Sequence, residues 1–137
     1  RMEEAYRIAK QLMYDRDAFS QWLGIHIAAV SPGQATLTMS VRPEMTNGVG
    51  VAHGGSTYAL ADSALAFAAN AHGRHSVSIE TSISHTQPVR AGDALRAVAT
   101  EESLTHKIGI YRIVVTNQDG VTVALFKGVV YRSEKTW

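Results

Sequence analysis

The sequence predicts an α+β fold in which a largely antiparallel sheet wraps around one long buried helix. The segment from Ser56 to His72 is apolar on almost every side, as in a helix that the rest of a protein surrounds. Four strand-like segments follow it without helices between them, an order typical of α+β proteins with antiparallel sheets. Together, these two observations place the helix against the sheet.

The length and charge of the chain limit its organisation. Its 137 residues suffice for one compact domain, so we expect a single domain over residues 1–137 that begins with a helix over residues 2–23. Thirteen Lys and Arg against twelve Asp and Glu give a net charge of +1, which argues against a nucleic-acid partner. Only 18% of the residues are charged, below the usual ~25%, so we expect another copy of the chain to cover part of the surface.

The elements before the buried helix are predicted from their periodicity. Apolar residues spaced by three and four between Met2 and Leu23 indicate an amphipathic helix, with a break near Asp15–Asp17. After a turn at Ser31-Pro32-Gly33, strict alternation from Ala35 to Val41 indicates a strand with one solvated face. Residues 43–55 have no period and contain four glycines, so we expect a loop there.

The buried helix and the strands after it complete the predicted fold. Seven of the thirteen residues from Ala59 to Ala71 are alanine, which lets a sheet approach the helix backbone closely, and Gly73 ends the helix. Further strands are expected over residues 77–83, 94–100, 107–117 and 121–132, with Asp119-Gly120 as the turn of the last hairpin.

Asp62 is the costly residue of the buried helix. Its neighbours one turn away carry no positive charge, and no Lys or Arg occurs from Ser56 to Gly73. An ionised carboxylate buried without a partner costs several kcal/mol, so Asp62 is solvated by a cleft, hydrogen-bonded or protonated. Each state makes it a candidate for chemistry, whereas an Asp62 that merely faces solvent or bonds a nearby serine would be structural.

His53-Gly54-Gly55 at the start of the same helix is the second candidate feature. Two glycines there leave backbone N–H groups uncovered at the positive end of the helix dipole. Such donors suit a carbonyl oxygen that becomes an oxyanion during acyl transfer. The alternative is a glycine hinge in which His53 is an ordinary capping or packing residue.

The spacing of these two features requires two chains if both are catalytic. Gly54 and Asp62 are eight residues apart, or about 12 Å along a helix. A reacting carbonyl must lie ~3 Å from both its attacking group and its oxyanion donor. An antiparallel second helix would bring Asp62 of one copy to Gly54 of the other, giving two equivalent sites. We therefore expect a homodimer and an inactive isolated monomer.

A resemblance to a known family rests on the segment around these glycines. The hotdog-fold acyl-CoA thioesterases, most closely their phenylacetate-pathway (PaaI) type, have a pattern similar to Asn47-Gly48-Val49-Gly50-Val51-Ala52-His53-Gly54-Gly55 followed by Tyr58-Ala59-Leu60-Ala61-Asp62. The resemblance extends from about Trp22 to Tyr131 and includes Pro88 and Ala91-Gly92-Asp93. It implies a hotdog fold, an antiparallel sheet wrapped around one long helix.

The resemblance also implies roles for individual residues. Asp62 would be the general base that activates water, or the nucleophile that attacks the thioester, and the Gly54 N–H would polarise the thioester carbonyl. His53 and Asn47 would shape the loop and the leaving-group side of the site. Ser78 would orient the water, and the remaining candidates for substrate contacts are Gly55, Arg90 and Lys107, with Arg112 as a further cation for the coenzyme A phosphates.

The implied reaction releases coenzyme A and a free acid from an acyl-CoA with a phenylacetyl, hydroxyphenylacetyl or medium-chain acyl group. It needs no metal and no organic cofactor, because a thioester is already an activated acyl group. The family works as dimers paired into a homotetramer. Two alternatives stay open: a hydroxyacyl-thioester dehydratase that uses His53 and Asp62, and an acyl-CoA-binding module without turnover.

Other classes are disfavoured by what the sequence lacks. It contains no Cys, and its six His show no metal-ligand spacing, so we expect no metal site. No apolar run reaches the ~18 residues of a membrane span, and no secretion signal is evident. We therefore expect a cytoplasmic protein without a membrane partner.

Overall fold

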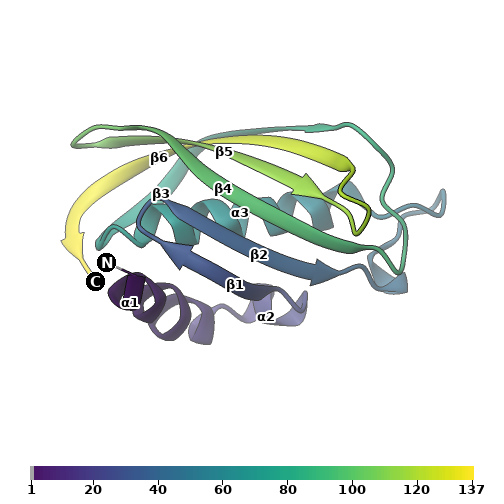
Figure 1. Ribbon diagram of the computed structural model, residues 1–137, viewed down its shortest axis with the longest axis horizontal. Helices are drawn as coiled ribbons and strands as arrows, with labels where there is room; N and C mark the ends of the chain where they lie inside the picture. The colour runs from purple at the N-terminus through teal and green to yellow at the C-terminus, as the bar shows by residue number, and fades with distance from the viewer. Residues whose placement is uncertain (1) are drawn as a thin grey trace.

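One sheet and one long helix form the body of the protein (Figure 1). The computed structural model describes residues 2–137, so Arg1, the first residue of the predicted domain, lies outside the described residues. Six strands pair antiparallel in the order β1-β2-β4-β5-β6-β3. The strands are β1 (His26–Ser31), β2 (Gln34–Ser40), β3 (Arg74–His85), β4 (Ala94–Leu104), β5 (Ile108–Thr116) and β6 (Thr122–Thr136).

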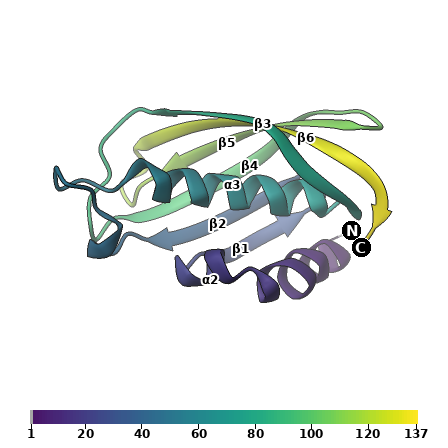
Figure 2. The ribbon, with the colours of Figure 1, turned by 180° about the vertical axis from the view of Figure 1, so that it is seen from behind.

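Helix α3 (Gly54–Asn70) crosses one face of this sheet (Figure 2). Ala61, Ala64 and Ala68 are fully buried, and these small side chains allow a close approach to the sheet. At Gly128 of β6 the strand leaves room for the Leu65 side chain of α3, because a Cβ at this position would collide with it. The predicted α+β fold, an antiparallel sheet around one long buried helix, is confirmed.

The N-terminal segment, expected as a helix with a break near Asp15–Asp17, is interrupted at that place and consists of several short helical pieces. They are α1 (Met2–Tyr6), a π-helical stretch (Arg7–Met13), a 3₁₀ turn (Tyr14–Arg16) and α2 (Ala18–Trp22). The chain leaves the helical region at Asp17, with φ −96° and ψ 84°, and the Asp17 side chain accepts the Ser20 N–H at 2.9 Å to cap α2. These pieces pack beside β1 and α3, where the Tyr14 hydroxyl donates to the Ile25 carbonyl at 2.5 Å.

Two strands, β1 and β2, precede the glycine loop, so the prediction of a single strand there is wrong. A β-bulge between Ile27 and Ala29 shifts its register on β2, so its buried residues Ile27 and Val30 are three positions apart. The period of two on which a strand prediction depends is therefore lost. The other predicted strands are all present, and β3, β4 and β6 extend beyond the predicted ranges.

Strand β3 lies at an edge of the sheet and, within residues 2–137, pairs with β6 alone. Its residues Val77 and Ile79 are 62% and 59% exposed, although both are apolar. The opposite edge is β1, against which the N-terminal helices lie (Figure 2). Within the described residues, no helix is both long and apolar enough to span a membrane.

Candidate active site

The glycine-containing loop is held in shape by Asn47. The Asn47 Oδ1 accepts the N–H groups of Val49 at 3.0 Å and Val51 at 3.3 Å, and a single β-bridge joins Thr46 to Ala52. The His53 N–H then donates to the Met45 carbonyl at 2.7 Å. These bonds set the direction in which the chain enters α3.

His53 caps α3 with its imidazole. Its backbone is extended, and its Nδ1 accepts the Gly55 N–H at 2.8 Å, so the ring proton of neutral His53 lies on Nε2. The His53 carbonyl accepts both the Ser56 N–H and the Ser56 hydroxyl, at 3.0 and 2.8 Å. The Gly55 N–H, expected to contact substrate, is therefore already engaged.

Gly54 supplies the open donor of this turn. Its N–H has no acceptor among residues 2–137, and it points out of the positive end of a 17-residue helix. Neighbouring rings leave little room for a side chain at both glycines: a Cβ on Gly54 would lie 3.1 Å from His85 Nε2, and one on Gly55 would lie 3.0 Å from His53 Nδ1. The first turn thus presents an N–H group that has no acceptor among the described residues and that belongs to a residue without a Cβ.

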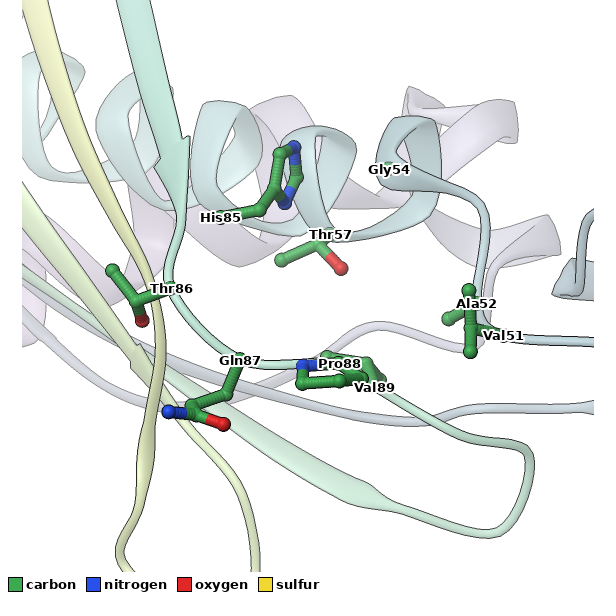
Figure 3. A pocket seen from close by; sticks show the side chains of 9 residues that line it. All are labelled: Val51, Ala52, Gly54, Thr57, His85, Thr86, Gln87, Pro88 and Val89. Atoms are coloured by element: carbon green, nitrogen blue, oxygen red, sulfur yellow. The ribbon is translucent and has the colours of Figure 1, made fainter.

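A cavity of about 480 Å³ opens beside Gly54 (Figure 3). Thr57 is 2% exposed as a residue and lines this cavity, and its hydroxyl has no hydrogen-bond partner among residues 2–137. The His85 ring stands at the first turn of α3, also on the cavity (Figure 3). The remaining lining residues are Val51, Ala52, Thr86, Gln87, Pro88 and Val89. Neither His85 nor Thr57 was predicted from the sequence as a site residue.

A second cavity, of about 260 Å³, lies at the same turn and touches His53 and Gly55. Phe19 and Trp22 of α2 line it, and Trp22 is 66% exposed with the Arg42 guanidinium 6.0 Å from its ring centroid. Residues of the first turn of α3 therefore line both cavities, and one of the cavities has aromatic walls.

Asp62 lies two turns further along α3. Its carboxylate is partly buried and forms no hydrogen bond or ion pair within residues 2–137. Burial raises the pKa of Asp62 above its ordinary value, because water is withdrawn from the charged form and no cation replaces it. A lone carboxylate with this pKa direction is suited to accept a proton.

The remaining candidates are dispersed in a single chain. Ser78 is exposed on β3, and Arg90 follows the cavity residues Pro88 and Val89. Lys107 lies in the β4–β5 turn, where its carbonyl accepts the Arg132 N–H at the end opposite Gly54. Arg112 pairs with Glu102 at 3.3 Å on the sheet surface. Within residues 2–137, no three His, Cys, Asp or Glu side chains gather as a metal site.

The sheet, the single enclosed helix and its open first turn are those of a hotdog-fold protein. Residues 49–124 match the family model of the thioesterase superfamily, and the chain belongs to that superfamily. It is 40% identical over 120 residues to acyl-coenzyme A thioesterase PaaI of Escherichia coli, a match that covers 88% of this chain and 86% of that protein. A putative esterase of Archaeoglobus fulgidus is 37% identical, over 90% of this chain and 80% of that protein.

Solved structures give the same assignment. The structure of E. coli PaaI, from the phenylacetic acid degradation operon, superimposes with a TM-score of 0.95 at 37% identity over 98% of this chain and 97% of that chain. The TT0310 protein of Thermus thermophilus gives 0.83 at 39% identity, over 86% and 99% of the two chains. The chain is thus of the PaaI type, and the resemblance found in the sequence is confirmed.

Proposed function

We propose that this protein hydrolyses acyl-CoA thioesters to the free acid and coenzyme A, using Gly54 and Asp62. The observation that carries the proposal is the first turn of α3, where the Gly54 N–H has no acceptor among the described residues and opens onto a cavity. Support comes from the 40% identity to acyl-coenzyme A thioesterase PaaI over 88% of the chain.

In the proposed reaction, the thioester carbonyl oxygen accepts a hydrogen bond from the Gly54 N–H, which stabilises the oxyanion of the tetrahedral intermediate. The ionised Asp62 takes a proton from water as the water oxygen bonds to the carbonyl carbon. The carbon–sulfur bond then breaks, and the thiolate receives the proton. If Asp62 attacks directly instead, an acid anhydride forms and water cleaves it, and the same two groups are needed.

The proposed site contains residues of two chains. Gly54 and Asp62 lie on one unbroken helix, so their separation of about 12 Å along its axis is too large for one carbonyl. We propose that a second copy lays its α3 antiparallel to the first. The half-buried or exposed face of α3 that would meet it carries small side chains around Asp62: Gly55, Ala59, Ser63 and Ala66.

The edge strand β3 supports the same arrangement. Its outer edge is unpaired among residues 2–137, and an exposed edge with apolar Val77 and Ile79 favours pairing with another chain. A two-fold axis beside β3 would also bring the partner's α3 C-terminal end toward Gly54, and Lys107 lies at that end. We propose that Lys107 of one chain and Arg90 of the other contact the coenzyme A phosphates, and that dimers pair into a homotetramer.

The acyl group is proposed to be of the aryl-acetyl or medium-chain type. The aromatic cavity of Phe19 and Trp22 next to the first turn of α3 favours a flat or apolar acyl group. A panel of phenylacetyl, hydroxyphenylacetyl, benzoyl and straight-chain CoA esters, assayed by thiol release, ranks the candidates by kcat/KM.

Asp62→Asn tests the reaction itself. Because the amide cannot accept the proton, we expect kcat to fall about 10²- to 10⁴-fold while the protein stays folded and associated. Release of free thiol from acyl-CoA, followed with a chromogenic disulfide reagent, gives the rate. An unchanged rate in the variant would show that Asp62 is not the base. Saturable binding of every ester without thiol release would indicate a binding module, and loss of water from a hydroxyacyl ester would indicate a dehydratase.

A further inference from the structure

We propose that His85 is a catalytic residue that donates a second hydrogen bond to the thioester carbonyl oxygen, beside the Gly54 N–H. This inference rests on the proposed function, since it concerns the same carbonyl. His85 ends strand β3, 31 positions after Gly54 in the chain, and its ring nevertheless stands at the first turn of α3 (Figure 3).

The direction of the bonds at Gly54 shows where a bound carbonyl oxygen would lie relative to the His85 ring. In an α-helix both the N–H and the Cα–Cβ bond lean toward the N-terminus, so an oxygen bound to the Gly54 N–H lies on the side where a Cβ would be. His85 Nε2 is 3.1 Å from that Cβ position, and Cε1 is 3.3 Å from it. An oxygen held by the Gly54 N–H is therefore within reach of His85 Nε2.

The polar groups around this point are free to bind a ligand. The His85 ring makes no hydrogen bond or ion pair within residues 2–137, whereas the His53 Nδ1 is engaged by Gly55. Thr57, one turn after Gly54, is a second and independent indication: its hydroxyl has no hydrogen-bond partner among the described residues, and the residue is 2% exposed and lines the cavity. No buried side-chain oxygen of the described residues lacks a partner, so the Thr57 hydroxyl is open to the cavity, where a polar occupant can bind it.

The chemistry that this arrangement serves is charge stabilisation. When water adds to the carbonyl carbon, negative charge develops on the carbonyl oxygen, and two donors hold it better than one. The Nε2 proton of His85 stays on His85 throughout, because the proton of the attacking water goes to Asp62 and then to the thiolate. The bond is stronger in the transition state than in the bound ester, so it raises kcat more than it lowers KM.

His85→Phe keeps a planar ring and removes the donor. We expect kcat to fall about 10²-fold with KM within about threefold of the original enzyme, and His85→Gln, which retains an N–H donor, to recover part of the loss. His26→Phe is the matched control, because His26 is exposed on β1, the edge of the sheet opposite β3. His26→Phe should retain the original kcat.

A spectroscopic measurement separates this role from a structural one. The probe is a CoA analogue in which CH₂ replaces the thioester sulfur and the ketone carbon is ¹³C. We expect the C=O stretch of the bound ketone to lie at lower frequency in the original enzyme than in His85→Phe, since a lost hydrogen bond strengthens the C=O bond. An unchanged frequency together with an unchanged kcat in His85→Phe would overturn the inference and leave the proposed function intact. If the original enzyme hydrolyses no acyl-CoA, the proposed function itself fails.

Discussion

At the scale of single residues, Gly54 and His85 lie so close together that a side chain added at position 54 would displace the His85 ring. A methyl group at position 54 would lie 3.1 Å from His85 Nε2, closer than a relaxed contact, so the ring has to move. We expect Gly54→Ala to lower kcat about 10²-fold in the original protein but less than about fivefold in a His85→Ala background, because there is no ring left to displace. Steady-state thiol release by the four proteins of this double-mutant cycle measures the coupling. Equal losses in both backgrounds would mean that the methyl group itself blocks the carbonyl.

The Asp62 carboxylate lowers stability at neutral pH while serving the proposed reaction. Burial raises its pKa in the folded protein above the unfolded value of 3.8, so the folded state is penalised as the group ionises. This penalty is absent below the unfolded pKa and complete above the folded one. We therefore expect Asp62→Asn to unfold at a higher temperature than the original protein at pH 7, with the difference vanishing below about pH 3.8.

Thermal unfolding followed by circular dichroism across this pH range measures the effect. Asp119→Asn is the control, since Asp119 is exposed in the β5–β6 turn. A stabilisation by Asp62→Asn that is equal at every pH would show that charge desolvation is not its cause.

At the scale of elements, the packing of α3 on β6 depends on Gly128. A Cβ there would collide with Leu65 Cδ2, and Leu65 is buried in the core, so the side chain has to shift within packed surroundings. We expect Gly128→Ala to lower the free energy of unfolding by about 1–3 kcal/mol. Urea titration measures the loss, and Gly48→Ala is the control because a Cβ at Gly48 meets no atom within 4 Å. Equal stability of the two variants would contradict this account of the helix–sheet contact.

The elements differ in how well local pattern predicts them. Helix α3 was predicted because it is apolar all round, and β2 because it alternates strictly between Gln34 and Ser40. β1 was missed because its bulge breaks the alternation. The N-terminal segment was predicted as a helix with a break near Asp15–Asp17, and the capping carboxylate of Asp17 does start α2 as a separate helix there. The prediction from local pattern fails where one extra residue sets the geometry, as in the bulge of β1.

At the scale of the whole molecule, the proposed two-chain site predicts complementation. In a mixed dimer of Asp62→Asn with a second inactive variant, Gly54→Val, one site has Gly54 from the first chain and Asp62 from the second, so it is intact. If each variant alone is inactive, a refolded equal mixture should recover about a quarter of the original activity, since half of the dimers are mixed and one of their two sites is restored. Thiol release before and after co-refolding measures it. No recovery in mixtures shown to contain mixed dimers would place both residues in a single-chain site.

Association should also be required for activity. Ile79→Lys places a charge on the exposed β3 edge, and we expect it to shift the protein toward monomers and to lower activity in proportion. Light scattering and thiol release on the same samples test this, with Val98→Lys on β4, also exposed, as the control. A monomer with full activity would contradict the shared site.

The sequence by itself determined the fold class and the family, because periodicity and the Asn47 to Asp62 pattern are local properties of the chain. It also identified Gly54 and Asp62 as candidates, since an open helix start and an unpaired carboxylate in an apolar helix are recognisable without coordinates. Only the tertiary structure brought His85 against Gly54 and engaged the Gly55 N–H with His53, and only there is the Thr57 hydroxyl seen to lack a partner among the described residues. These facts depend on how α3 and the end of β3 meet, and no local pattern encodes the distance between residues that lie 31 positions apart.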